Sequence, residues 1–348
     1  MTRVTPGHGN ETRARGDAAE PGSRSCSAGK ASILGVVMRI AHISDPHLLS
    51  LSGARWLDFA NKRWIGGMNL LFKRGRHHKN EVFEAMVADL NDHRVDHVLC
   101  TGDVTNLALE PEFRFAREHF DRLELGFDGV TVLPGNHDAY VEGGSDQFRE
   151  HFEPYFRSDP EWRRDDGHDH GAWPIVRVRP PVAIIGLSTS LHTPWFTAYG
   201  RLGSDQLERL REILRDPRLA DAMRVVAIHH PPIGGHAASR GRGLHDREEF
   251  ARVLAEAGAE LVLHGHEHRD LAGQLPGPSG APIPVRGIQS GTFDDGKRDA
   301  MRARYRVYEI SAGAAGRPEV VREELRAWAP SAGRFVDDET AVSARAAG

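Results

Sequence analysis

Short apolar segments alternate with amphipathic segments along most of this 348-residue chain. Short apolar runs indicate buried strands, whereas apolar residues spaced three and four apart indicate helices that pack on a sheet. Val82, Met86 and Leu90, for example, would lie on one face of a helix. Such a chain folds as a layered α/β domain, with hairpins in its second half. The pattern predicts strands at 39–44, 96–101, 130–133, 175–178, 182–187, 225–229, 261–264, 284–288, 305–310 and 319–323, and helices at 81–93, 111–123, 145–155, 204–214 and 247–257.

Five groups of polar residues follow directly after predicted strands. In α/β folds the loops that leave the carboxyl ends of neighbouring strands converge, and functional sites collect there. We therefore expect these groups to meet at one edge of the sheet structure. The groups are Asp45-Pro46-His47, Gly102-Asp103, Gly135-Asn136-His137-Asp138, His229-His230-Pro231 and Gly265-His266-Glu267-His268.

The side chains in these groups are carboxylates, imidazoles and one amide, without a thiolate. This donor set suits Mn, Fe, Zn, Co or Ni better than a soft metal. It holds more candidate ligands than one tetrahedral zinc ion can use. Ligands shared around one bridging carboxylate would hold two metal ions about 3.5–4 Å apart, which is the arrangement for in-line displacement at phosphorus.

The order D-x-H, G-D, G-N-H-D, H and G-H-x-H resembles that of the calcineurin-like metallophosphoesterase superfamily. Within it, the spacing and the run His229-His230-Pro231-Pro232 look most like the bacterial class III cyclic-nucleotide phosphodiesterase and glycerophosphodiesterase branch. The motifs span residues 45–268, and the resemblance covers about 39–325. It implies an α/β fold of the four-layer αββα sandwich type, with two metal ions at one edge.

The resemblance also implies seven metal ligands, for which Mn, Fe or Zn are the expected ions. One ion would be held by Asp45, His47 and His268, and the other by Asn136, His229 and His266. Asp103 would bridge the two ions. The pattern favours His229 over its neighbour His230 as the ligand.

His137 and Asp138 are the predicted catalytic residues. Two cations in this site would lower the pKa of a bridging water and so would supply a hydroxide near neutral pH for in-line attack at phosphorus. The resemblance implies that His137 hydrogen-bonds the phosphate or protonates the leaving oxygen. Asp138 is expected to orient His137 or its loop rather than to bind metal.

Several other polar residues are expected to support the site or to face the substrate. Asn106, His230 and His264 are assigned to this group from their places beside the motifs. His77-His78 is predicted to lie in a loop, with a substrate role as the alternative. His42 alternates into the first strand and is predicted to be a core histidine.

The insertion at 50–79, between the first motif and the first helix, is interpreted as a cap. Its stretch 55–76 mixes aromatic, aliphatic and basic residues, and packing beside the metal site to shape substrate access is the favoured reading. An amphipathic element that meets a lipid surface or a lipid-phosphate substrate is the alternative. Structural packing or a homodimer interface is the third reading. The segment 191–200, with Trp195 and Phe196, is a second candidate wall.

Three segments divide the chain. Residues 1–37 are predicted to be a disordered extension, with Met38 as an alternative start. Residues 38–326 are expected from the resemblance to form the metallophosphoesterase domain, and 327–348 are predicted to be a flexible tail. No apolar run is long enough to span a bilayer, so a cytoplasmic location is expected.

Composition excludes several classes of protein. The chain carries 45 basic and 49 acidic residues, for a net charge of −4, which argues against long nucleic acid as a partner. Its 2 cysteines, Cys26 and Cys100, make neither a disulfide framework nor a thiolate metal cluster. The expected partner is a small phosphate ester.

The predicted function is metal-dependent hydrolysis of a phosphodiester or phosphomonoester. A cyclic nucleotide is the substrate suggested by the resemblance. Hydrolysis of a lipid phosphate or a nucleotide-sugar phosphate is the rival. A non-catalytic scaffold on the same fold is the third hypothesis, but such a chain is expected to lose ligands, and all seven are present.

Overall fold

The structure is a computed structural model that describes residues 37–52, 78–163, 173–294, 301–313 and 316–338. Two six-stranded sheets form its framework. Sheet 1 has the order β12 (Arg334–Asp337), β11 (Pro318–Ala329), β10 (Arg304–Ala312), β1 (Met38–Ile43), β2 (His97–Cys100) and β3 (Val130–Val132). Sheet 2 has the order β4 (Ile175–Arg179), β5 (Val182–Gly186), β6 (Met223–Ala227), β7 (Leu261–His264), β9 (Pro282–Gly287) and β8 (Leu271–Pro276).

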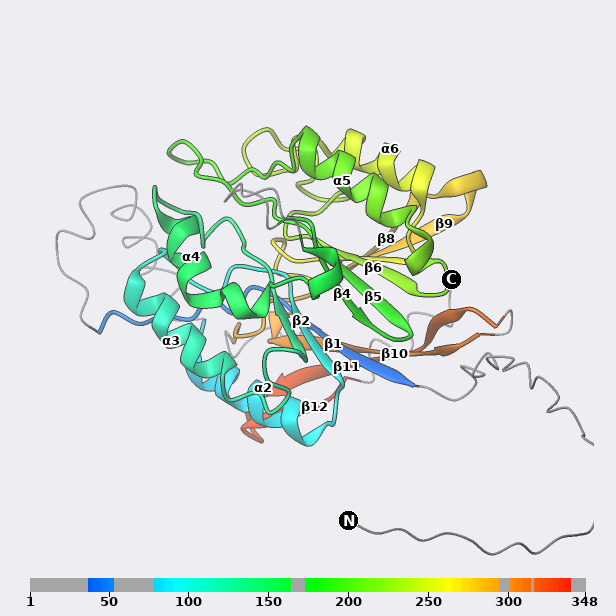
Figure 1. Ribbon diagram of the computed structural model, residues 1–348. Helices are drawn as coiled ribbons and strands as arrows, with labels where there is room; N and C mark the ends of the chain where they lie inside the picture. The colour runs from blue at the N-terminus through cyan, green and yellow to red at the C-terminus, as the bar shows by residue number, and fades with distance from the viewer. Residues whose placement is uncertain (1–36, 53–77, 164–172, 295–300, 314–315, 339–348) are drawn as a thin grey trace, which may run out of the picture. The chain divides into compact units, whose positions relative to one another are not determined.

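Helices cover the outer sides of the two sheets (Figure 1). The α-helices beside sheet 1 are α2 (Asn80–Asp92), α3 (Glu110–Phe120) and α4 (Gly144–Phe152). Those beside sheet 2 are α5 (Ser204–Leu214) and α6 (Arg247–Ala257). Short 3-10 turns lie at Glu153–Tyr155, Pro160–Trp162, Pro217–Leu219 and Pro278–Gly280. None of the helices in the described part of the chain has the length and apolar character needed to cross a membrane.

Alternating side chains of sheet 2 explain why helices and a second sheet enclose it. Ile184, Val225 and Leu263 belong to the core that also contains sheet 1 and its helices. Their chain neighbours Ile185 and Val226 belong to the core that contains α5 and α6. Because successive side chains of a strand point to opposite faces, the apolar runs cover both faces of this sheet. The fold is thus the four-layer αββα type, and the predicted fold class is confirmed.

Each sheet contains a run of parallel strands, at one side of sheet 1 and in the middle of sheet 2. β1, β2 and β3 are parallel, as are β5, β6, β7 and β9. β4 and β5 form an antiparallel pair that turns at Pro180-Pro181, as the sequence predicted. The carboxyl ends of the parallel strands lead into the polar groups of the sequence, so the topology fixes where a site forms.

Two strands were not predicted from the sequence, and both are edge strands. β8 at the edge of sheet 2 and β12 at the edge of sheet 1 expose part of their side chains and lack an apolar run. The prediction of a loose tail from residue 327 is wrong for residues 327–338. β11 continues to Ala329, and Ala327 and Phe335 are buried. Residues 339–348 and 1–36 lie outside the described residues.

A buried arginine ties edge strand β4 to the segments around β3 and α4. Arg177 donates to the carbonyls of Phe127 and Val130 over 2.7 Å each, of Pro154 over 2.8 Å and of Arg157 over 2.9 Å. Burial lowers the pKa of Arg177 to about 10. The guanidinium stays charged at neutral pH, and the carbonyl oxygens replace the water that it loses.

Candidate metal centre

All seven predicted ligands lie in loops at the carboxyl ends of strands. The loops after β1, β2 and β3 carry Asp45, His47, Asp103 and Asn136, and the loops after β6 and β7 carry His229, His266 and His268. The amide of His266 donates to Asp45 Oδ2 over 3.0 Å and so joins the edges of the two sheets. The amide of His47 donates to the Asp103 carbonyl over 3.0 Å. The structure therefore brings both predicted ligand sets together.

The first ligand set has the spacing that one metal ion requires. His47 Nε2 and His268 Nε2 are 3.0 Å apart, and His268 Nε2 is 3.2 Å from Asp45 Oδ1. His47 Nε2 also lies 3.9 Å from Asp45 Oδ1 and 3.7 Å from Asp103 Oδ2. Donors about 2.1 Å from one ion, at adjacent coordination positions, are separated by roughly 3.0–3.4 Å. The four residues fit one ion with little rearrangement.

The second ligand set shows the same spacing. Asn136 Oδ1 is 2.8 Å from His266 Nδ1 and 3.1 Å from His229 Nε2, and the two nitrogens are 3.3 Å apart. His229 Nε2 is 3.5 Å from Asp103 Oδ2, the same oxygen that faces His47. One carboxylate oxygen therefore faces both sets, which is the position required of a bridging ligand.

Hydrogen bonds on the far side of two ligand rings, those of His47 and His229, select the tautomer that binds metal. His47 Nδ1 donates to the Thr105 carbonyl over 3.1 Å, and His229 Nδ1 donates to the Thr101 carbonyl over 2.8 Å. Because a carbonyl only accepts, each Nδ1 carries the proton and each Nε2 presents its lone pair to the ligand set. Asp45 Oδ1 is buried and accepts no hydrogen bond of good geometry from the described residues. The residues present thus fit two metal ions.

Charge is concentrated on one pair of ligands. Burial alone would raise the pKa of Asp103, but His229 and His137 lower that pKa well below its usual range. Burial alone would lower the pKa of His229, but the Asp103 carboxylate raises that pKa to about 9. Without metal, a proton on His229 therefore offsets the Asp103 charge. A bound cation would take the place of that proton.

Backbone strain is concentrated at the ligands. Five of them have positive φ: Asp45 (50°), His47 (44°), Asp103 (56°), His266 (69°) and His268 (50°). Side-chain-bearing residues seldom adopt this conformation, and it collects at functional sites where the surroundings enforce it. Gly102, at φ 110°, leads into Asp103, and a Cβ there would lie 2.8 Å from His229 Nδ1. The close approach of the two loops requires glycine at that position.

His137 borders both ligand sets. Its amide donates to Asp103 Oδ1 over 2.7 Å, and its Nδ1 donates to the Asn106 carbonyl over 2.6 Å. The ring stacks on Tyr140, with centroids 5.7 Å apart, and meets the His47 ring edge-on at 4.8 Å. The side chain is only half-buried. The His137 side chain therefore lies where it can contact an oxygen of a bound substrate.

Asp138 does not have a catalytic position. It is fully buried, and its carboxylate accepts from the amides of Val104 (3.2 Å), Thr105 (2.9 Å) and Gly135 (2.8 Å) and from the Thr105 hydroxyl (2.9 Å). Burial and the Asp103 charge raise the pKa of Asp138 to about 7. The assignment of Asp138 as a catalytic residue is corrected, whereas the expected orienting role agrees with these contacts: Asp138 positions the loops that carry Asp103 and His137.

The three residues expected to support the site or to face the substrate all lie behind the ligands. Asn106 Nδ2 donates to the His47 carbonyl. His230 is buried, its Nε2 donates to the Ala198 carbonyl over 3.0 Å, and burial lowers its pKa to about 3. His264 is also buried, and burial lowers its pKa to about 4. The alternative that His230 faces the substrate is wrong, because the ring has no exposed surface.

The structure adds one histidine to the site. His78 lies next to His47 and His268, with ring centroids 4.9 Å and 5.6 Å from theirs. His78 belongs to none of the five motifs. Apart from its being a histidine, nothing in the sequence before α2 marks it as a residue of the metal site. His42 is a buried core histidine, as predicted, with Nε2 3.0 Å from Thr101 Oγ1. Residues 53–77, most of the predicted cap, lie outside the described residues.

Comparison with known proteins gives a family. A family model described as calcineurin-like phosphoesterase matches residues 38–270. The chain belongs to the calcineurin-like phosphoesterase family. A comparison with curated proteins gave no match. The family and the two ligand sets together identify a metal-dependent phosphoester hydrolase.

Solved structures show the same fold at low sequence identity. The purple acid phosphatase PPD1 of yellow lupin (Lupinus luteus) is 11% identical with a TM-score of 0.53, over 88% of this chain and 53% of that one. This chain thus spans about half the length of the lupin protein. A dimetal phosphatase from Danio rerio is 14% identical with a TM-score of 0.50, over 84% of this chain and 99% of that one.

Proposed function

We propose that the chain hydrolyses a small phosphodiester at a two-metal centre, with a cyclic nucleotide as the expected substrate. The observation that carries the proposal is that Asp103 Oδ2 faces both ligand sets, 3.7 Å from His47 Nε2 and 3.5 Å from His229 Nε2. Two ions held there, of which Mn, Fe and Zn are the expected ones, would supply a nucleophile at neutral pH and offset charge at phosphorus.

The charge of the ligands favours an anionic substrate. Asp45 and Asp103 are the two carboxylates among the seven ligands, and the others are imidazoles and an amide. Two divalent cations in this set keep a net positive charge. A phosphate ester brings the opposite charge into the site, and electrostatic attraction supports its binding.

His137 is the residue that would act on the leaving group. Its Nδ1 is committed to the Asn106 carbonyl, so Nε2 is the atom that can donate to or accept from a substrate oxygen. A nucleotide alkoxide is a poor leaving group, and a positioned general acid is worth about 10²–10⁴ in rate. A natural diester therefore depends more on protonation of its leaving oxygen than an activated aryl ester does.

Two exposed aromatic residues support a substrate with a planar apolar part. Trp195 is 54% exposed and Phe196 is 82% exposed. Their loop also holds Ala198, whose carbonyl accepts from His230, and the His230 ring lies 4.5 Å from the His266 ring. Exposed aromatic faces in a loop that is tied to the ligand set through Ala198 and His230 suit a nucleobase, which stacks on such faces.

The test is a substrate panel on protein loaded with Mn²⁺. Bis(p-nitrophenyl) phosphate is compared with p-nitrophenyl phosphate, and cyclic AMP and cyclic GMP with a nucleotide-sugar diphosphate and a lysophospholipid. Chelated protein and Asp103→Ala are the controls. We expect chelator-sensitive turnover, a preference for the diester, and a raised KM for cyclic nucleotides in Trp195→Ala. Faster turnover of the lipid or the nucleotide-sugar would replace the substrate proposal by its rival. If the protein binds two ions but turns over none of these esters, the proposed hydrolytic activity is refuted.

A further inference from the structure

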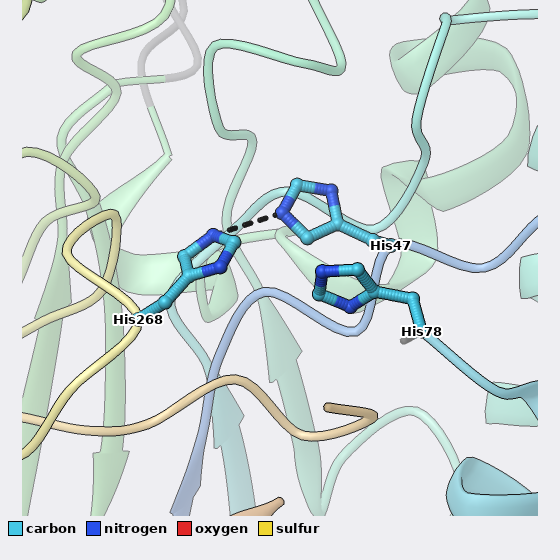
Figure 2. A group of neighbouring side chains, drawn as sticks. All are labelled: His47, His78 and His268. Atoms are coloured by element: carbon cyan, nitrogen blue, oxygen red, sulfur yellow. Dashed lines mark hydrogen bonds between the residues drawn. The ribbon is translucent and has the colours of Figure 1, made fainter. Parts of the chain in front are cut away.

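Three histidine rings converge at the first ligand set, although only two belong to a sequence motif. Figure 2 shows His47, His78 and His268 pointing toward one another from different segments of the chain. One ring nitrogen from each lies within 4.8 Å of the other two. His78 is 8% exposed, so this imidazole is held inside the protein.

Two hydroxyl groups determine which nitrogen of His78 carries the proton. The Thr292 hydroxyl donates to the Pro46 carbonyl over 2.6 Å, and the Ser290 hydroxyl donates to the Asp45 carbonyl over 2.6 Å. Each hydroxyl has one proton, so both oxygens act as acceptors toward His78 Nδ1, at 2.8 Å and 3.4 Å. His78 Nδ1 is therefore the protonated nitrogen, and the lone pair lies on Nε2.

This is the arrangement that the predicted ligands use. His47 and His229 also donate from Nδ1 to an oxygen behind the ring and present Nε2 to the metal site. A metal-binding histidine is normally oriented in this way by its second nitrogen. The Ser290 and Thr292 hydroxyls that orient His78 in turn donate hydrogen bonds to the Asp45 and Pro46 carbonyls, in the loop that carries the first ligands.

The backbone around His78 is also held in place. His78 forms an isolated bridge with Phe293, and the amide of Lys79 donates to the Thr292 carbonyl over 3.2 Å. The His78 ring packs edge-on against Phe293, with centroids 5.5 Å apart. The segment 290–293 therefore fixes both the main chain and the ring of His78 before any ion binds.

We propose that His78 is an additional ligand, through Nε2, of the metal ion held by Asp45, His47 and His268. The proposal rests on the two-metal centre of the proposed function. A third imidazole leaves the charge of the site unchanged and makes its donor set richer in nitrogen. Nitrogen donors favour Zn and Fe, whereas oxygen donors favour Mn. His78 would thus make the first site more selective for Zn or Fe than the second site is.

The first measurement is the titration of metal-free protein with Co²⁺, followed by its visible absorption and by calorimetry. The variants are His78→Ala, Thr292→Val and the double variant. His93→Ala is the matched control, because His93 ends the helix that begins after His78 and pairs with Glu324 at 2.9 Å. Circular dichroism and thermal melting of each variant check that the fold is intact.

We expect His78→Ala to weaken one of the two Co²⁺ equilibria by at least about tenfold and to change the absorption band of that ion. Thr292→Val should weaken the same equilibrium by about tenfold. The double variant should be no weaker than His78→Ala, because Thr292 acts through the ring. Competition between Zn²⁺ and Mn²⁺ should shift toward Mn²⁺ in His78→Ala, and His93→Ala should match the wild type.

Other outcomes overturn the proposal in distinguishable ways. If His78→Ala binds both ions with wild-type affinity and spectrum, His78 is not a ligand, and the two-metal function stands. If its metal binding is unchanged but KM rises, His78 contacts substrate instead. If the effects of His78→Ala and Thr292→Val on metal affinity are additive, Thr292 does not act by orienting the His78 ring, and the orientation argument for the proposal fails. If the wild type binds fewer than two ions, the function and this proposal fail together.

Discussion

Replacement of Asp138 separates a positioning role from a catalytic one. The carboxylate accepts from three backbone amides, those of Val104, Thr105 and Gly135. Asp138→Ala leaves these donors buried without their acceptor, at about 1–3 kcal/mol for each. We expect unfolding free energy to fall by roughly 3–6 kcal/mol, since water will reach some of the space. The total free energy of unfolding of a domain is only about 5–15 kcal/mol, so much of the stability depends on this one side chain.

The assay is urea unfolding of metal-free protein, together with metal content and turnover. Asp138→Asn keeps one acceptor oxygen, and we expect a loss of about 1–3 kcal/mol, so this variant stays measurable if Asp138→Ala does not fold. Asp146→Ala, at an exposed position in the first turn of α4, is the matched control and should change stability by less than about 0.5 kcal/mol. The reasoning is refuted if Asp138→Asn keeps wild-type stability and metal content but loses turnover, because this is the result expected when a catalytic residue is replaced.

Three further outcomes follow from the ligand geometry. Asp103→Ala should lose most of both ions, measured by elemental analysis, because its Oδ2 faces both ligand sets; retention of one full equivalent would contradict the bridging role. His137→Ala should keep both ions and lower kcat on a cyclic nucleotide by about 10²–10⁴, with a smaller loss on bis(p-nitrophenyl) phosphate; equal losses on both would remove its role toward the leaving group. Burial alone would lower the pKa of His229, but the Asp103 carboxylate raises that pKa to about 9. A proton therefore competes with metal for His229 below about pH 9. Apparent metal affinity in calorimetry should therefore rise by up to about tenfold per pH unit until about pH 9, and a flat profile from pH 6 to 9 would contradict this account.

The sequence predicted the fold and the grouping of the ligands for one physical reason. Strands buried on both faces are apolar runs, and a polar group that interrupts such a run at its carboxyl end is visible in the sequence. Asp45, Asp103 and His229 each stand at such an interruption, and the structure brings them together. β8 and β12 were not predicted because edge strands bury only part of their side chains and therefore lack this pattern.

The supporting residues were not predictable in the same way, because their roles depend on contacts between distant segments. His78 is oriented by Thr292, 214 positions further along the chain. Asp138 lies within a motif and was expected to orient its loop, but its partners in the Asp103 loop, which the structure shows, could not be named from the sequence. A local pattern reports which side chains lie at the end of a strand. It does not report which of them turn toward the substrate and which turn toward the protein.

Metal removal should loosen the site without unfolding the sheets. The five ligands with positive φ each cost on the order of 1 kcal/mol, and two bound ions at about 100 times their dissociation constants stabilise the folded state by about 2.7 kcal/mol each. The sheets are held independently by the cores on both sides of sheet 2. Hydrogen exchange with and without chelator should therefore show faster exchange in the loops at 45–48, 102–106 and 265–268, while the amides of β1 and β6 keep their protection. If chelation accelerates exchange equally in loops and strands, the strain is not local to the ligands. If it changes neither, the surrounding hydrogen bonds alone hold the strained conformation, and metal binding adds nothing to the order of the site.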